Sequence, residues 1–197
     1  MRVVTALFLG AIVITGCKSN KGAAAAPTES HDEEPETQVT ERELPEQGLI
    51  QQEVDLDVDG KPEIVNYFRQ RSEDRLLVKK EVDLNHDGRI DLISYFDDSG
   101  KLKKEQMDSD YDGSFDWTDH YRDGKRVMSE YDTETDGKPN VFKYYEVAEG
   151  QTRLARKERD TDGDGKIDVW ERFDAEGNVI RTGKDTDGDG KMDERSE

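Results

Sequence analysis

A short acidic motif occurs six times between residues 55 and 193. Each copy has oxygen-bearing side chains at its positions 1, 3, 5 and 9 and a glycine at position 6. We number the copies loop 1 to loop 6, and the side chains at these four positions are Asp55, Asp57, Asp59 and Glu63; Asp83, Asn85, Asp87 and Asp91; Asp108, Asp110, Asp112 and Asp116; Asp132, Glu134, Asp136 and Asn140; Asp160, Asp162, Asp164 and Asp168; and Asp185, Asp187, Asp189 and Asp193. Oxygen ligands without thiolate or imidazole select hard cations, and their flexible number suits calcium better than magnesium. The motif therefore predicts six calcium-binding loops.

The spacing of the copies favours calcium binding over the simplest alternative, which is a set of solvated acidic turns. The copies begin at residues 55, 83, 108, 132, 160 and 185. Solvated turns are also rich in aspartate and glycine. A turn alone does not need acidic side chains at the same four positions in six successive repeats, so the metal is the better explanation.

The charge of the chain supports the same conclusion. The net charge is −19, from 48 acidic and 29 basic residues. The loop positions hold 22 of the acidic residues, which leaves 26 against the 29 basic ones. Carboxylates a few ångströms apart repel one another unless a cation neutralises them. A strongly acidic protein also repels phosphate, so we expect no nucleic-acid partner.

The loops resemble the first nine residues of the EF-hand loop. An EF-hand also needs flanking helices and a glutamate at position 12, where only Asp119 and Glu171 are acidic here. Residues 83–92 are similar to the calcium loop of FG-GAP repeats, and the motif also resembles thrombospondin type 3 repeats. The segments between loops resemble MORN-type hairpins. These resemblances concern motifs within residues 49–197 and imply calcium loops carried on β-hairpins.

The segments between the loops predict β-strands. Residues 64–68, 92–96, 117–121, 141–145 and 169–173 follow the first five loops and are rich in β-branched and aromatic residues. Turns containing Gly100, Gly124, Gly150 or Gly177 come next, and a second strand then returns to the following loop. We expect an all-β antiparallel hairpin repeat that forms an elongated twisted sheet or solenoid, with the calcium loops along one edge.

The side-chain pattern of these strands does not give one apolar face. In the first five repeats positions 10 and 14 are apolar, but position 12 between them is polar. This mixture favours an elongated ribbon or solenoid over a compact sandwich. We expect the aromatic residues, including Trp117 and Trp170, to form cross-strand ladders, and an exposed binding platform is the alternative.

The N-terminal residues indicate export and lipid anchoring. The apolar run from Val3 to Ile14 has the length of a signal-peptide core and is too short for a permanent membrane helix. Residues 14–17 resemble the lipobox of bacterial lipoproteins, which implies that Cys17 is acylated; an ordinary secretory leader with an incidental cysteine is the alternative. Lys18 after the cysteine implies the outer membrane. The expected organisation is a signal peptide at 1–16, a lipidated N-terminus and disordered tether at 17–48, and the repeat domain at 49–197.

No set of side chains suggests catalysis. His31 lies in the tether, His86 in loop 2 and His120 on a strand, and none has a nucleophile poised beside it. We therefore expect no enzyme. One hypothesis is a calcium-stabilised binding or adhesion module of the cell envelope, with an envelope protein or glycan as partner. The other is a structural or calcium-buffering envelope lipoprotein without a specific ligand.

Overall fold

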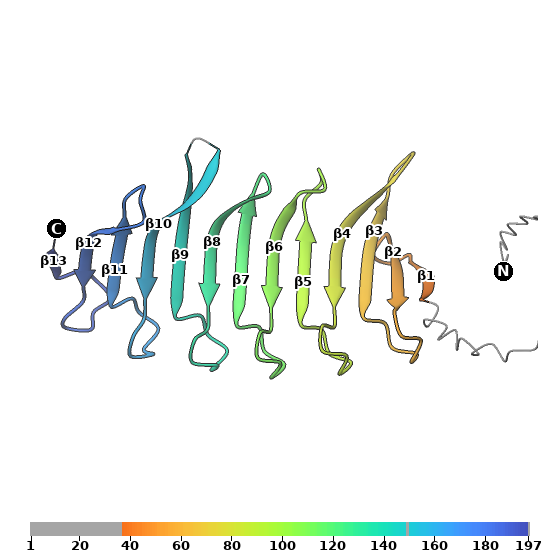
Figure 1. The fold of residues 1–197 in the computed structure, drawn as a ribbon, viewed down its shortest axis with the longest axis horizontal. Helices are drawn as coiled ribbons and strands as arrows, with labels where there is room; N and C mark the ends of the chain where they lie inside the picture. Colours follow the sequence, from red (N-terminus) through yellow and green to blue (C-terminus); the bar gives the residue numbers. More distant parts are fainter. Residues whose placement is uncertain (1–36, 149, 197) are drawn as a thin grey trace, which may run out of the picture. The chain divides into compact units, whose positions relative to one another are not determined.

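The computed structural model describes residues 37–148 and 150–196, which contain thirteen β-strands and no helix. The strands are β1 (Gln38–Leu44), β2 (Leu49–Asp55), β3 (Ile64–Gln70), β4 (Arg75–Val82), β5 (Leu92–Phe96), β6 (Leu102–Met107), β7 (Trp117–Arg122), β8 (Lys125–Tyr131), β9 (Val141–Ala148), β10 (Gln151–Arg159), β11 (Val169–Phe173), β12 (Val179–Lys184) and β13 (Glu194–Ser196). They form one open antiparallel sheet in chain order (Figure 1). The expected all-β hairpin repeat is confirmed. Of the two expected forms, sheet and solenoid, the structure has the open sheet.

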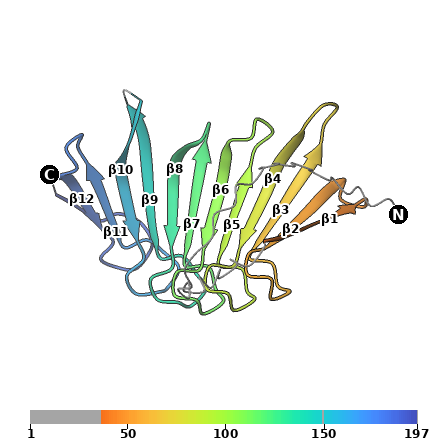
Figure 2. The same ribbon diagram turned by 45° about the vertical axis from the view of Figure 1, so that its right-hand side comes forward.

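The two edges of the sheet carry different connections. The six acidic loops join β2 to β3 and every second pair after it, and they lie along one edge, while the hairpin turns lie along the other (Figures 1 and 2). In the turn between β5 and β6, Oδ1 of Asp97 accepts hydrogen bonds from the N–H groups of Ser99 and Lys101, at 2.8 and 3.0 Å. Gly100 in this turn has a φ of 80°, a value that side chains disfavour.

The prediction of a disordered tether is wrong over its last residues, because β1 and a turn occupy positions 38–48. β1 pairs with β2 along its whole length, from Gln38 opposite Asp55 to Leu44 opposite Leu49. The many glutamates concealed this strand, since its pairing comes from the backbone of β2 and from polar contacts such as Gln52 Nε2 to Glu41 Oε1 at 2.9 Å. The sheet thus begins eleven residues before the expected boundary at 49.

The leader, Cys17 and the remainder of the expected tether lie outside the described residues. The described residues contain no helix that is long and apolar enough to cross a membrane.

The sheet has little apolar core. Val65 and Leu76 are the only buried hydrophobic residues in the described part of the chain. The most deeply buried side chains are polar: Asp91, Asp108, Asp119 and Ser129. An apolar row does cross the sheet next to the loops, where successive strands place Ile64, Val82, Leu92, Met107, Trp117, Tyr131 and Val141 opposite one another. Hydrogen bonds and cross-strand pairs therefore provide most of the cohesion.

Candidate metal centres in the loops

The carboxylate at position 1 organises each loop. In loop 2, Oδ1 of Asp83 accepts the N–H of His86 at 2.8 Å, and Oδ2 accepts the N–H of Gly88 at 2.7 Å. Loops 1, 3, 5 and 6 repeat both bonds. Loop 4 keeps the bond to the glycine, but its second bond comes from Glu134, at 3.1 Å to Asp132. The backbone thus wraps around the first aspartate and fixes its orientation.

The carboxylates at positions 3 and 5 are also held by the backbone. In loop 5, Oδ1 of Asp162 accepts the N–H of Asp164 at 3.1 Å, and Oδ1 of Asp164 accepts the N–H of Lys166 at 2.8 Å. Each aspartate uses one oxygen in these bonds. The second oxygen of Asp162 is left to meet a cation, whereas that of Asp164 lies 3.4 Å from Lys166 Nζ.

Position 9 closes the loop from the strand side. In loop 2, Asp91 is 1% exposed and its Oδ2 accepts the N–H of Leu84 at 2.6 Å. In loop 5, both the N–H and the hydroxyl of Thr161 donate to Oδ2 of Asp168, each at 2.6 Å. Because these bonds stabilise the charged carboxylate, the hydroxyl first and the N–H second, they lower the pKa of Asp168 below its ordinary value of 3.8.

The hydroxyl at position 2 is a feature of the site that the sequence analysis missed. It is visible in the sequence, since loops 3 to 6 have Ser109, Thr133, Thr161 and Thr186 there. Each hydroxyl donates to the side chain at position 9. In loop 6 the N–H and hydroxyl of Thr186 lower the pKa of Asp193, and in loop 3 the bonds from Ser109 outweigh the opposing effect of burial and lower the pKa of Asp116.

The structure brings the acidic side chains together in four of the six loops. In loop 1 the carboxylate oxygens of all four positions lie within 4.8 Å of one another. In loops 3, 5 and 6 the same holds for positions 1, 3 and 9, which are Asp108, Asp110 and Asp116; Asp160, Asp162 and Asp168; and Asp185, Asp187 and Asp193. The carboxylates at position 5 of these three loops, Asp112, Asp164 and Asp189, lie outside the groups.

Loops 2 and 4 form no such group of acidic side chains, and each has an asparagine at one of the positions. In loop 2 this is Asn85, whose Nδ2 lies 3.3 Å from Oδ2 of Asp87. In loop 4 it is Asn140, whose Oδ1 accepts the N–H of Thr133 at 3.0 Å. An amide oxygen can bind a cation but carries no charge, so these two loops have the weaker electrostatic attraction.

Repulsion among the acidic groups is evident in loop 3. The pKa of Asp110 is raised, first by desolvation and then by the charges of Asp112, Asp116 and Asp108, although a backbone hydrogen bond opposes this. A cation at this point would remove the repulsion and restore the charged form.

The acidic residues at position 12 do not join the loops. Asp119 is fully buried on a face of the sheet, where it accepts hydrogen bonds from the Ser129 hydroxyl and, at 3.1 Å, from Arg126 Nη1. Glu171 lies 3.6 Å from Arg159 Nη2. The completing ligand of an EF-hand loop therefore has no counterpart at position 12 here.

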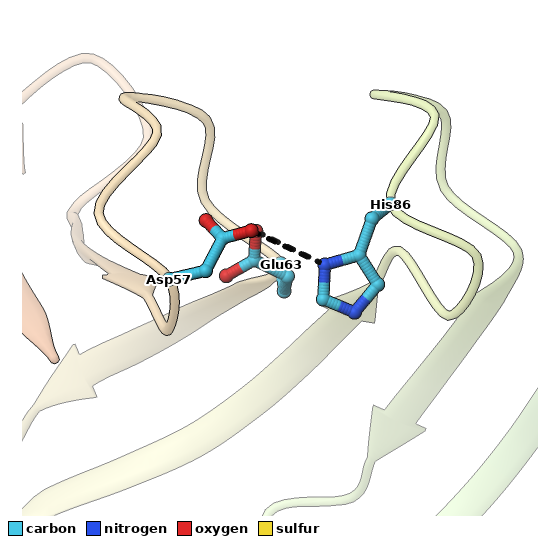
Figure 3. A group of neighbouring side chains, drawn as sticks. All are labelled: Asp57, Glu63 and His86. Carbon is cyan, nitrogen blue, oxygen red and sulfur yellow. Dashed lines mark ion pairs between the residues drawn. The ribbon is translucent and has the colours of Figure 1, made fainter. Parts of the chain in front are cut away.

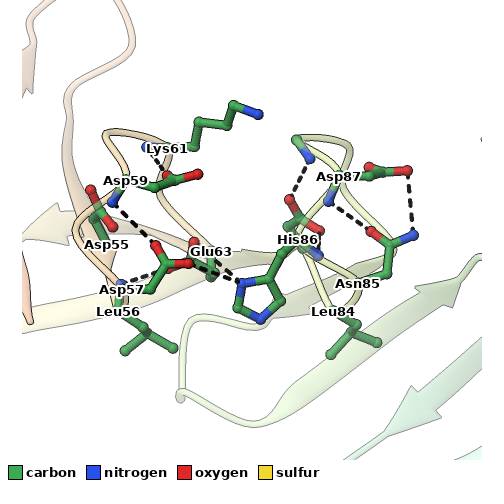
Figure 4. A network of polar contacts seen from close by, with 12 residues as sticks. Asp55, Leu56, Asp57, Asp59, Lys61, Glu63, Leu84, Asn85, His86 and Asp87 are labelled. Carbon is green, nitrogen blue, oxygen red and sulfur yellow. Dashed lines mark hydrogen bonds and ion pairs between the residues drawn. The ribbon is translucent and has the colours of Figure 1, made fainter. Parts of the chain in front are cut away.

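Neighbouring loops are connected to one another. The N–H of Asp83 donates to the carbonyl of Glu63 at 2.8 Å, and the same bond links each later pair of loops. His86 adds a side-chain contact between loops 2 and 1 (Figures 3 and 4). Its Nδ1 lies 3.7 Å from Oε1 of Glu63 and 3.9 Å from Oδ2 of Asp57. The sequence analysis assigned His86 no role, because spacing alone does not show which side chain faces the preceding loop.

Comparisons with known proteins give little further information. No protein-family model matches the chain, and no curated protein matches it. A solved structure that it resembles is the crystal structure of accessory secretory protein 1,2 and 3 in Streptococcus pneumoniae, at 19% sequence identity and a TM-score of 0.35. The match covers 51% of this chain and 18% of that one, so this chain spans less than a fifth of its length. No function is transferred at this level of similarity.

Proposed function

We propose that the protein is a lipid-anchored cell-envelope protein whose loops bind calcium, and that the bound ions hold the sheet as a binding or adhesion module. The observation that carries the proposal is the convergence of carboxylate oxygens to within 4.8 Å in loops 1, 3, 5 and 6. The anchoring part rests on the sequence around Cys17.

The geometry of the groups fits calcium. Oxygen ligands lie about 2.4 Å from a bound calcium ion, so two ligands of one ion are at most about 4.8 Å apart. The same limit also admits magnesium, whose ligands lie at about 2.1 Å; calcium is favoured because it tolerates the different numbers of carboxylates that converge in these loops. Loops 3, 5 and 6 supply only oxygen, the donor that hard cations prefer.

Calcium binding is coupled to the stability of the sheet in this proposal. The described residues bury only two hydrophobic side chains, so a packed core contributes little. The loops join every second pair of strands, and ions that bind the folded loops more tightly than the unfolded chain stabilise the fold. Affinities of about 0.1–1 mM would suit an exported protein.

Calorimetric titration of the chain from Lys18 onward tests the proposal. We expect calcium to bind at several sites and to raise the melting temperature measured by circular dichroism. D110N and D168N should each remove one site. D97N is the matched control, because Asp97 caps a turn at the opposite edge and belongs to no group of acidic side chains. Absence of both binding heat and thermal shift would refute the proposal.

The anchor needs a separate test. Cells that express the full chain should incorporate labelled palmitate into it, and C17A should abolish the label. Label that persists in C17A would exclude the lipobox.

One observation favours the second function, a structural or calcium-buffering envelope protein. The strand aromatics make contacts within the sheet: Trp117 stacks on Tyr131 with centroids 6.4 Å apart, and Lys79 Nζ lies 5.0 Å from the Tyr67 ring centroid. The exposed large hydrophobic residues of the described chain include no strand aromatic. Affinity capture from envelope extract, with calcium and with chelator, separates the two functions, because only the binding module retains a calcium-dependent partner.

A further inference from the structure

Three arginines from adjacent strands lie opposite one another near the C-terminal end of the sheet. Arg156 of β10 pairs with Arg172 of β11, which pairs with Arg181 of β12. Like charges directly opposite in a sheet repel and destabilise the pairing. This row is conspicuous in a chain with a net charge of −19. The loop carboxylates explain the negative charge, but they do not explain the arginines.

The arginines border a cavity of about 260 Å³ with an apolar side. Trp170, Met192 and Arg195 also line it. Trp170 pairs with Gly183, and a Cβ at Gly183 would collide with the Met192 side chain. A glycine inside a strand marks such a close approach. Because Gly183 has no side chain, Met192 and the indole ring of Trp170 can line the same cavity.

Two of the four arginines that line the cavity, Arg172 and Arg195, have no carboxylate partner among the described residues. Arg156 lies 3.3 Å from Glu158, and its guanidinium carbon lies 4.0 Å from the ring centroid of Tyr144. Within the described residues, Arg172 forms no ion pair, and Arg195 has a hydrogen-bond contact only to Met192 Sδ, at 3.7 Å. The cavity therefore attracts an anion from outside.

The chemistry of the lining indicates the kind of anion. A guanidinium binds carboxylate or sulfate through two parallel hydrogen bonds. An indole ring offers a flat apolar surface against which a sugar ring can pack. Neighbouring strands lie about 4.8 Å apart, so the row of three presents positive charge over roughly 10 Å. We propose that this arginine–tryptophan cavity binds an acidic glycan, that is, a polysaccharide carrying carboxylate or sulfate groups.

The inference deepens the proposed binding module by naming its ligand class, and it does not depend on the calcium loops. Titration of the chain from Lys18 onward with dextran sulfate oligosaccharide, followed by tryptophan fluorescence and calorimetry, tests it. We expect saturable binding, a change in Trp170 emission that W170F removes, and no binding of uncharged dextran. R172Q should weaken binding about tenfold, which corresponds to about 1.4 kcal/mol. R122Q removes a charge from an exposed arginine at the end of β7 and should leave binding unchanged.

The remaining outcomes are also decisive. Removing one arginine from the row should raise the melting temperature of R172Q, which separates loss of binding from loss of folding. Equal binding of inorganic sulfate would show a site for the ion alone and overturn the proposal. Equal binding of poly-glutamate would overturn it in favour of an acidic peptide. Calcium titration of the same sample shows separately whether the loops bind metal, so failure of either idea is recognised on its own.

Discussion

The imidazole Nδ1 of His86 lies 3.7 Å from Oε1 of Glu63, so a residue of loop 2 faces the acidic group of loop 1. Glu63 is 4% exposed, and its other oxygen accepts the N–H of Leu56 at 2.6 Å. Loops 1 and 2 are thus in electrostatic contact. Charge changes in one loop should affect cation binding in its neighbour.

A permanent positive charge at position 86 should compete with calcium in loop 1. We expect H86K to raise the melting temperature in chelator, because the ammonium attracts the carboxylates of loop 1, and to reduce the further rise on adding calcium. Melting curves with and without calcium measure both effects. H120K, on a strand beside Glu130, is the control and should leave the calcium-dependent rise intact. An unreduced rise in H86K would show that loop 1 does not bind the ion.

Loop 4 should gain affinity when its missing carboxylate is supplied. Asn140 occupies the position that Asp168 has in loop 5, and its Oδ1 already accepts the N–H of Thr133. We expect N140D to destabilise the protein in chelator through repulsion and to increase its stabilisation by calcium. Calorimetry should show tighter binding. S72D adds the same charge in an exposed turn at the opposite edge and should not change calcium binding; if it did, the effect of N140D would be one of net charge.

The sequence was sufficient to predict most of the sheet but not its N-terminal limit. β-branched and aromatic clusters predict β3, β5, β7, β9 and β11, since these strands are half-buried and their composition shows it. β1 is mostly exposed and polar, so its sequence resembles a tether, and only pairing with β2 makes it a strand.

For the site, spacing predicts the members of each loop but not the contacts between loops. The repeat identified the side chains at positions 1, 3 and 9 that converge in loops 3, 5 and 6. It could not show that position 5 lies apart from them, or that His86 faces Glu63, because both depend on the path of the backbone. The sequence alone also could not reveal the arginine row, since Arg156 and Arg172 become neighbours only through strand register.

The threonine at position 2 of loop 5 should control the acid stability of that loop. The pKa of Asp168 is lowered in the folded protein, so its ionisation stabilises the fold above about pH 4, and this contribution is lost as pH falls through the folded pKa. T161V removes the hydroxyl bond and should bring the pKa of Asp168 back toward 3.8. In chelator, the variant should melt below wild type at pH 5 to 7, and the difference should shrink in acid. T152V, an exposed change on β10, should show no such trend.

A glycine at position 4 of loop 1 should relieve backbone strain there. Val58 has a φ of 62°, where loops 5 and 6 have Gly163 and Gly188. A left-handed conformation costs a side-chain-bearing residue about 1 kcal/mol, and more when it is β-branched. We expect V58G to stabilise the protein by about 1 kcal/mol in urea unfolding. V147G, on exposed β9, should instead destabilise it by roughly 0.5 kcal/mol. A loss of stability in V58G would show that the valine side chain outweighs the strain.

The buried Asp119 should contribute to stability whether or not calcium is present. Its Oδ1 accepts the Ser129 hydroxyl, and its Oδ2 accepts Arg126 Nη1 at 3.1 Å and the Tyr121 hydroxyl at 3.3 Å. Burial and the charge of Asp119 together raise the pKa of Tyr121 to about 12, which keeps the phenol protonated as a donor. Removing the carboxylate leaves the fully buried Ser129 hydroxyl with only a 3.4 Å contact to the Tyr145 hydroxyl. We therefore expect D119A to lower the free energy of unfolding by about 3 kcal/mol, equally in calcium and in chelator.

Comparing D119A with D116A distinguishes a buried carboxylate on the face of the sheet from a carboxylate in a calcium loop. Asp116 belongs to the convergent group of loop 3, so its removal should cost more in calcium than in chelator, where repulsion is relieved at the same time. Urea unfolding of both variants under both conditions gives the four values needed. A calcium-dependent loss in D119A would assign Asp119 to a metal site after all. A calcium-independent loss in D116A would leave loop 3 without a bound ion, since its carboxylates would then act only by capping the backbone.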